Sequence, residues 1–188
     1  MQRIWKYGGI VASVVLIAFG IGSIVTGANG INQVRDNLAR EQIVGSPDMK
    51  GIAGKQVKTG ADAKAFADGM RVHTLEATKG KTYSQMGRYL TASGQGTDDE
   101  KLAAKDPKTG APVENGARNI WVTETALSTA LNTSYFAEQV ATFAIVMGAA
   151  LLLVGIGFLV VSLRLLSRRT EESEARESVK PPVAVTAG

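Results

Sequence analysis

"VATFAIVMGAALLLVGIGFLVVSL", residues 140–163, contains no charged side chain. A second apolar run, "GGIVASVVLIAFGIGSIVTG", occupies residues 8–27, and no charged residue lies between Lys6 and Arg35. A helix rises about 1.5 Å per residue, so about 20 apolar residues cross the roughly 30 Å of hydrocarbon in a bilayer. Both runs reach that length, and they predict two transmembrane helices.

Basic residues flank the two apolar runs on their outer sides. Arg3 and Lys6 precede the first run, and Arg164, Arg168 and Arg169 follow the second. Because Lys and Arg concentrate on the cytoplasmic side of membrane proteins, we expect both termini of this multi-pass plasma membrane protein to be cytoplasmic. The predicted parts are a cytoplasmic N-terminus with transmembrane helix 1 (1–28), an extracytoplasmic mainly helical domain (29–139), transmembrane helix 2 (140–163) and a cytoplasmic tail (164–188).

The predicted tail has few apolar residues that could be buried. Its sequence changes from basic to acidic and then becomes rich in proline, in "SRRTEESEARESVKPPVAVTAG", residues 167–188. Segments of this composition do not bury enough apolar surface to offset the entropy of ordering the chain. We therefore expect the tail to be disordered.

A cleaved signal peptide is the alternative interpretation of the first apolar run. Thr26, Gly27 and Ala28 supply small residues after a basic start, as a cleavage site would need. The apolar core of a signal peptide is typically about 7 to 15 residues long. The run at residues 8–27 is longer than that, so we favour an uncleaved membrane anchor.

The charge of the segment between the apolar runs limits its partners. The whole chain has 188 residues and a net charge of +4, but residues 28–139 carry 14 Lys or Arg and 13 Asp or Glu. A nearly neutral segment produces no strong field for nucleic acid or for anionic lipid, so we predict no nucleic-acid partner. The chain has no cysteine, so an exported domain would be held together by packing alone.

Small residues recur along one face of each apolar run, at the spacing of a heptad. Lipid tails are as apolar as leucine, so helices associate in a bilayer by close van der Waals approach, which small residues permit. Gly, Ala and Ser are also common in such runs without any pairing role, which is the simpler explanation. We predict an antiparallel hairpin with helices crossing at about 20°. The predicted helix-packing seam comprises Gly9, Ser13, Gly20, Ser23, Gly27, Ala141, Gly148, Leu152, Gly155 and Ser162.

The two faces continue beyond the apolar runs, where large residues replace small ones. Val34 and Leu38 follow the first run, and Leu131 precedes the second. In water the hydrophobic effect returns, so large side chains at helical spacing hold helices together as in a coiled coil. We expect both membrane helices to continue as stalks, the first ending before Gly45 and the second starting near Thr123.

The rest of the outer segment is predicted to form short helices joined by loops. Apolar residues three and four apart predict a helix over residues 61–78. Capping boxes at Thr82 and Thr97 predict two further short helices, and residues 106–119 are predicted to be a loop. The expected fold is an all-α membrane protein: two antiparallel transmembrane helices extended as stalks, with a small mainly helical extracytoplasmic domain between them.

The tripeptide Gly80-Lys81-Thr82 matches the end of a nucleotide-binding phosphate loop. The complete motif requires an earlier glycine, and that position is Leu75. The loop should also follow a buried strand, whereas a helical pattern precedes Gly80. We therefore predict that Gly80 ends a helix and that the chain binds no nucleotide.

No group of residues predicts catalytic, cofactor-binding or metal-binding chemistry. His73 is the only histidine, so a zinc site would need three carboxylates in a chain without cysteine. We expect His73 to be packed on an apolar helix face and hydrogen-bonded to the backbone, rather than to act as a base. The residues Phe66, Met70, His73 and Trp121 form a possible partner surface, although Trp121 is also a candidate for the domain core.

Three segments carry a resemblance to known proteins. They are "GINQVRDNLAREQI" (30–43), "AKAFADGMRVHTLEATKGKTY" (63–83) and "TETALSTALNTSYFAEQVATFAI" (123–145). The chain resembles, over most of its length outside the tail, an uncharacterised family of two-span membrane proteins from high-GC Gram-positive bacteria. The resemblance implies a two-span membrane protein, and it implies no activity and no catalytic residue.

Three function classes follow from the sequence. The first is a non-enzymatic accessory or scaffolding protein, embedded in the lipid bilayer, that binds other membrane proteins or itself. The second is a pore or transport component formed by oligomerisation, and the third is a cell-envelope enzyme. The first is favoured because the apolar runs contain no ionisable residue, which a polar pathway through the bilayer would usually display.

Overall fold

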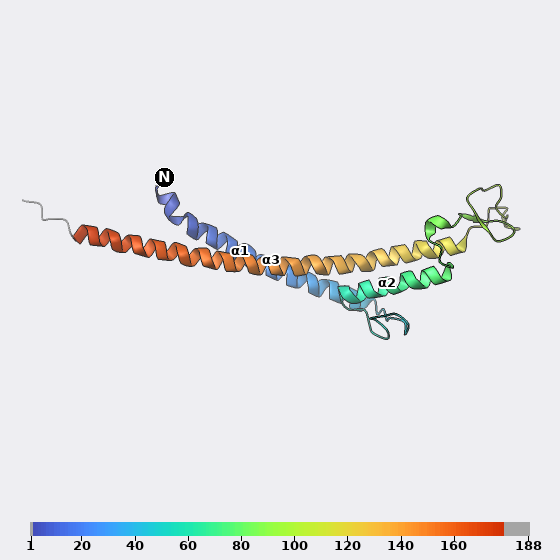
Figure 1. Ribbon diagram of the computed structural model, residues 1–188, viewed down its shortest axis with the longest axis horizontal. Helices are drawn as coiled ribbons and strands as arrows, with labels where there is room; N and C mark the ends of the chain where they lie inside the picture. Colours follow the sequence, from blue (N-terminus) through green and yellow to red (C-terminus); the bar gives the residue numbers. More distant parts are fainter. Residues whose placement is uncertain (1, 179–188) are drawn as a thin grey trace, which may run out of the picture. The chain divides into compact units, whose positions relative to one another are not determined.

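The computed structural model describes residues 2–178, and it describes side chains for residues 7–168. Most of these residues are helical, as the sequence predicts. The three long helices are α1 (Gln2–Arg40), α2 (Gly60–Ala77) and α3 (Gly116–Ser178) (Figure 1). Between α2 and α3 lie the 3-10 helix η1 (Tyr83–Gln85) and the antiparallel strands β1 (Tyr89–Leu90) and β2 (Gly96–Thr97).

The chain folds as two compact units. The terminal unit contains residues 1–29 and 141–188, and the central unit contains residues 30–140. The terminal unit is built from the first part of α1 and the later part of α3. The central unit contains the end of α1, all of α2 and the beginning of α3. The two apolar runs therefore belong to the terminal unit, except for Val140 at the border, and most of the polar sequence belongs to the central unit.

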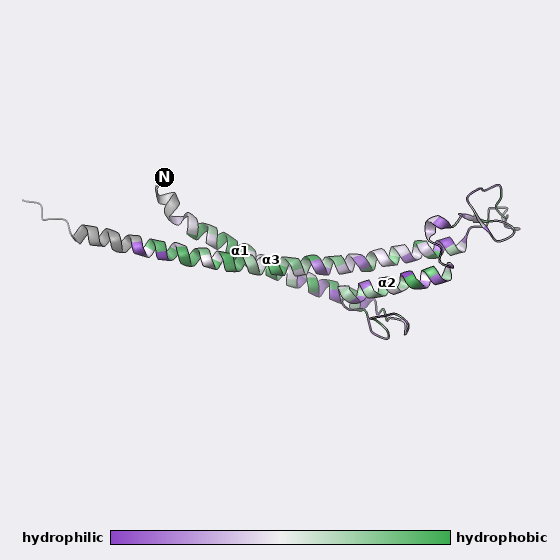
Figure 2. Cartoon of the chain, viewed as in Figure 1, coloured by the Kyte–Doolittle hydropathy of each residue, from purple (hydrophilic) through white to green (hydrophobic). Residues whose placement is uncertain are grey.

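Two helices are long and apolar enough to cross a membrane, which confirms this part of the sequence prediction. They are the stretches Tyr7–Arg40 of α1 and Gly116–Arg168 of α3. Figure 2 shows that hydrophobic residues dominate both helices in the terminal unit. Only 11% of the most apolar window of each helix is buried. A core helix of a soluble protein would be mostly buried, so these helices present their apolar side chains outward.

A small apolar core holds the central unit together. Leu38 of α1 and Leu131 of α3 meet Ala63 and Ala67 of α2. Residues 41–59 complete this core, because they fold back and bury the side chains of Met49, Ile52 and Val57. The stalk residues Leu38 and Leu131, which the sequence assigned to the continued helix faces, thus lie in one core.

Polar side chains and glycine fix the two ends of α2. At its start, the Thr59 hydroxyl accepts a hydrogen bond from the Asp62 amide, and the Asp62 carboxylate accepts one from the Thr59 amide. This reciprocal capping box satisfies two amides that have no partner within the helix. At its end, Gly80 has φ +77 and its amide donates to the Leu75 carbonyl over 2.7 Å. Gly80 therefore ends the helix, as predicted.

The short helix predicted at Thr97 is wrong. Thr97 belongs to β2 and pairs with Tyr89, and the Asp98 carboxylate accepts a hydrogen bond from the Arg88 amide. The Thr97 hydroxyl and the Asp99 carboxylate each accept from an amide two residues further on. Ser, Thr and Asp side chains that satisfy nearby amides in this way compete with helix formation. The same residue types that suggested a helix start therefore form a turn.

The helix predicted at Thr82 is the single turn η1. Its start is held by the Thr82 amide, which donates to Gln85 Oε1 over 2.8 Å, as one half of a capping box would. The two strands that follow make the central unit mixed, so the all-α expectation holds only for its long elements.

The helix α3 begins earlier and ends later than the sequence indicated. It starts at Gly116 rather than near Thr123, inside the predicted loop. Buried Trp121 fixes its first turns, because its indole bonds to the carbonyl of Lys81. The expected disorder does not begin at residue 164, since α3 continues to Ser178 through a stretch rich in Glu, Arg and Ala, which favour helix. The remaining tail residues, 179–188, lie outside the described residues.

Candidate helix-packing site

Two glycines allow α1 and α3 to approach closely in the terminal unit. A Cβ atom added to Gly20 would lie 2.8 Å from both the Gly148 carbonyl oxygen and the Leu152 amide nitrogen. A Cβ added to Gly148 would lie 2.6 Å from the Gly20 carbonyl oxygen. Real Cβ atoms essentially never approach other heavy atoms within 3.0 Å. The two backbones therefore touch directly, and no larger residue fits between them.

Further contacts continue along the same two helices. A Cβ at Gly27 would lie 2.6 Å from the Ala141 carbonyl oxygen, and a Cβ at Gly155 would lie 2.8 Å from Cγ1 of Ile17. At the other end of the pair, Gly9 faces the side chain of Ser162. Residues further along α1 contact residues nearer the start of α3: Gly9 contacts Ser162, and Gly27 contacts Ala141.

The structure brings most of the predicted seam residues into this contact. Ser13 is fully buried, and its hydroxyl donates to the Gly9 carbonyl over 2.6 Å. The Ser13 hydroxyl is thereby satisfied within its own helix although it is buried at the contact. Ser23 is half-buried and lies beside the contact, where it lines a groove.

Three other glycines of the terminal unit have open surroundings. A Cβ added to Gly8, Gly22 or Gly157 would meet nothing within 4 Å. Glycine content alone therefore does not mark a packing position. Gly8 and Gly157 provide matched controls for substitutions at Gly20 and Gly148, because they lie in the same two helices and outside the groove described below.

An apolar groove of about 530 Å³ runs along the surface of the terminal unit beside the seam, and it shares Ser23 with the seam. Neither ionisable nor bulky polar side chains line it. Three of its residues, Ala18, Gly22 and Thr26, are spaced four apart and give α1 a second small face. The complete lining is Ala18, Phe19, Gly22, Ser23, Thr26 and Ala144. Sequence reasoning missed this groove, although the small residues at four-residue spacing could have indicated it.

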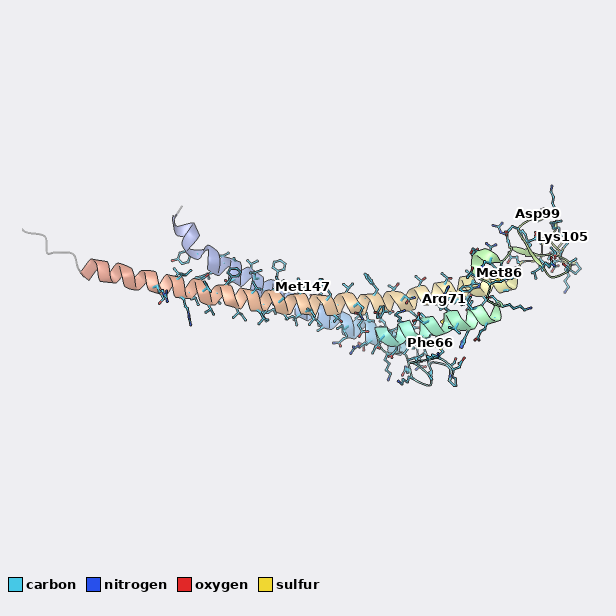
Figure 3. All side chains as sticks on the ribbon, in the orientation of Figure 1. Phe66, Arg71, Met86, Asp99, Lys105 and Met147 are labelled. Atoms are coloured by element: carbon cyan, nitrogen blue, oxygen red, sulfur yellow. The ribbon has the colours of Figure 1, made fainter. Side chains whose placement is uncertain are left out.

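The predicted partner surface in the central unit is largely core. Trp121 is 3% exposed, and its indole N–H donates to the Lys81 carbonyl over 2.9 Å. The Arg71 guanidinium lies 5.3 Å from the centre of the Trp121 ring (Figure 3, where Arg71 is labelled). Phe66 and Met70 are partly buried against the apolar core. Trp121 is therefore taken up by the fold of the central unit, while Phe66 and Met70 keep part of their surface exposed. A partner surface at these residues stays a prediction.

His73 is placed differently from the prediction. Its side chain is 37% exposed, and its Nε2 is 2.6 Å from Oδ2 of Asp48 rather than bonded to the backbone. Helix α2 carries His73, and the folded-back segment 41–59 carries Asp48, so the pair links two elements. The hydrogen bond from His73 is the largest cause that lowers the pKa of the Asp48 carboxyl from its usual 3.8.

We expect the Asp48 carboxyl to titrate below pH 3.8 in the folded protein, and to return toward 3.8 in His73→Ala. A lowered folded-state pKa means that the contribution of this pair is complete above the unfolded pKa and is lost as pH falls through the folded pKa. Carboxyl carbon chemical shifts, followed from pH 6 to pH 2, measure this directly. An Asp48 midpoint that is identical in the two proteins would contradict the assignment.

A charged cluster joins all three helices of the central unit. Glu138 of α3 is buried, and its Oε1 accepts from Arg35 Nη2 over 2.6 Å and from Arg35 Nε over 3.0 Å. Its Oε2 accepts from the amide of Gly60, the first residue of α2. A carboxylate at a helix N-terminus is favoured by the helix dipole and by the free amides there. The contact between Arg35 and Glu138 was not predicted from the sequence, where the two residues are 103 positions apart.

A comparison of this chain with known proteins finds no matching family model, no matching curated protein and no matching solved structure. The resemblance to a two-span membrane family therefore rests on the three sequence segments alone. Among residues 7–168, whose side chains the structure describes, no group of three or more His, Asp or Glu side chains is arranged to hold a metal ion. The described residues thus leave the packing surfaces of the terminal unit as the best-defined candidate site.

Proposed function

We propose that this chain is a non-enzymatic accessory protein of the plasma membrane that binds other membrane proteins. In this proposal the first part of α1 and the later part of α3 cross the bilayer as an antiparallel hairpin, with both termini in the cytoplasm. The central unit is then extracytoplasmic. The terminal unit is the anchor, and the groove on its surface is the site that receives a partner.

The single observation that carries the membrane proposal is the outward-facing apolar surface of the terminal unit. Side chains as large as Phe19, Phe143 and Leu153 are more than 60% exposed there. A continuous surface of this kind would aggregate in water, whereas lipid tails solvate it without cost. The falling order of α3 partners along α1 supports the antiparallel arrangement. The basic residues at both ends support cytoplasmic termini.

The groove supports a partner that is itself a transmembrane helix. Its lining is uncharged and, apart from Phe19, made of small residues, so a helix can approach the α1 backbone closely at Gly22. In lipid, such close approach is the main source of helix association. The occupant that fits best is therefore an apolar helix of another membrane protein, and a second copy of this chain is the alternative outcome.

Two measurements test the proposal in cells. Single cysteines replace Lys101 and Ser173 in this cysteine-free chain, and an impermeant thiol reagent is added to intact cells. We expect labelling at position 101 and none at position 173; the reverse pattern would contradict the topology. A photoreactive residue at Phe19 should then yield a discrete adduct with another membrane protein.

The groove variant is Gly22→Leu, which fills the groove, and the matched control is Gly157→Leu, which projects into open space outside the groove lining. We expect the adduct at Phe19 to be lost in Gly22→Leu and kept in Gly157→Leu. An adduct that contains only this chain would assign the groove to self-association. Adducts that survive Gly22→Leu unchanged would remove the proposed docking site.

A further inference from the structure

A second cavity, of about 530 Å³, lies in the central unit between the end of α2 and the start of α3. Its lining includes Lys81, the middle residue of the Gly80-Lys81-Thr82 tripeptide that matches the end of a phosphate loop. Met86, labelled in Figure 3, forms part of its apolar wall together with Leu90. We call this cavity the Lys79–Lys81 cleft. Its lining is Ala77, Thr78, Lys79, Lys81, Gln85, Met86, Gly87, Leu90, Gly94, Gly96, Asn115, Gly116 and Ala117.

The backbone that carries the two lysines is held rigidly. The Lys81 carbonyl accepts hydrogen bonds from the Trp121 indole over 2.9 Å and from the Thr78 hydroxyl over 2.7 Å. The Lys81 amide donates to the Thr78 carbonyl over 3.1 Å. Lys79 has φ +54, a left-handed conformation that costs a non-glycine residue roughly 1 kcal/mol. These hydrogen bonds hold the turn in a conformation in which Lys79 is strained, and both lysines line the same cavity.

The lining of the cleft combines positive charge with neutral polar and apolar side chains. No lining residue is acidic, and the two lysines are its only charged side chains. Gln85 and Asn115 add amides, and Met86 is buried in the apolar wall. The cavity beside His73 differs, because Asp48, Asp68 and Glu76 line it. The Lys79–Lys81 cleft therefore differs in charge from that cavity, whose lining has three carboxylates and one lysine, Lys50.

We propose that the Lys79–Lys81 cleft binds a small organic anion, with a carboxylate or phosphate group paired to the two lysines and an apolar part against Met86 and Leu90. The volume lies within the roughly 300–1,000 Å³ of small-molecule sites, which are typically apolar with a few placed polar groups. Two lysines as flexible donors suit either anionic group. This binding activity goes beyond the accessory function and does not depend on it.

Trp121 provides a built-in reporter for the test. The chain has two tryptophans, Trp5 and Trp121, so Trp5→Phe leaves only the indole that is bonded to Lys81. The full chain with Trp5→Phe is reconstituted in lipid nanodiscs and titrated with benzoate, phenyl phosphate and benzamide. Benzamide is the neutral counterpart of benzoate. We expect a saturable change in Trp121 fluorescence with at least one anion and none with benzamide, and the preferred anion identifies the head group.

Variants locate the site. The double variant Lys79→Gln/Lys81→Gln should raise the Kd for the preferred anion at least tenfold, and Lys101→Gln, an exposed lysine outside the lining, should leave it unchanged. Gly116→Leu should also weaken binding, because a Cβ at Gly116 meets only open space at the cavity. Circular dichroism checks that each variant is folded.

Three results would overturn the proposal: no saturable response to either anion, an equal response to benzamide, or a Kd unaffected by the double variant. Loss of partner adducts at the groove would not bear on this test, because the Trp121 signal reports the central unit alone.

Discussion

Gly20→Leu is expected to separate the helices of the terminal unit. There is no space for a Cβ at Gly20, since an added Cβ would lie 2.8 Å from both the Gly148 carbonyl oxygen and the Leu152 amide nitrogen. Both obstacles are backbone atoms, so no side-chain rotation relieves the overlap. Forcing a larger residue into a packed contact typically costs about 1–3 kcal/mol, and more where backbone must move. In lipid, close approach is also the main attraction, so the same substitution removes the force that pairs the helices.

Energy transfer between dyes attached near residues 11 and 160 measures the pairing in lipid nanodiscs. We expect transfer to fall in Gly20→Leu and in Gly148→Leu. Gly157→Leu is the matched control, because it adds the same side chain to the same helix pair in open space. Transfer that is equal in Gly20→Leu and Gly157→Leu would show that the glycine contact does not hold the helices together.

Ile52→Ala is expected to destabilise the central unit by about 2–5 kcal/mol, the usual range for a buried isoleucine truncated to alanine. Ile52 is fully buried in the cluster that joins α1, α2 and α3. The Ile52 carbonyl also lies so close to Gly45 that a Cβ at residue 45 would not fit. The segment 41–59 therefore has little freedom to collapse into the cavity that the truncation of Ile52 would leave. Poor collapse places the cost toward the upper end of the range.

Hydrogen exchange of the central-unit amides, measured in nanodiscs, reports this loss. The control is Val44→Ala in the same segment, whose side chain is 55% exposed and whose truncation should change stability by less than about 0.5 kcal/mol. Equal protection of α2 amides in Ile52→Ala and in the unsubstituted protein would mean that the segment 41–59 is not part of the cooperative core.

The long helices could be predicted from sequence because one physical effect dominates them. Uncharged runs of about 20 residues have few alternatives to helix, and the stop at Gly80 follows from a single glycine with positive φ. The seam could also be proposed, since small residues at heptad spacing are visible without coordinates. The structure places Gly20 against Gly148, a pairing that the spacing alone did not specify.

Features that depend on long-range partners could not be predicted. Thr97 and Asp98 have the residue types of a helix start. They form a strand end and a turn instead, because Thr97 pairs with Tyr89 and the Asp98 carboxylate accepts a hydrogen bond from the Arg88 amide. His73 was expected to bond to backbone because its partner, Asp48, is 25 residues away in a segment without periodic pattern. Trp121 was expected both in a core and at a surface, and its indole contact with Lys81 decides for the core.

The central claim is that two apolar helices of one chain form an antiparallel hairpin in a bilayer, and an engineered disulfide tests it most directly. A Cβ at Gly9 lies 3.3 Å from Ser162 Cβ, close to the roughly 3.5–4.5 Å between the Cβ atoms of a disulfide. The double variant Gly9→Cys/Ser162→Cys is placed in nanodiscs that hold one copy, with a protease site inserted after Ser93. After oxidation and cleavage, the two fragments should stay linked until a reductant is added, whereas those of Gly9→Cys/Ala141→Cys should separate. Linked fragments only in the Gly9→Cys/Ala141→Cys protein would contradict the hairpin.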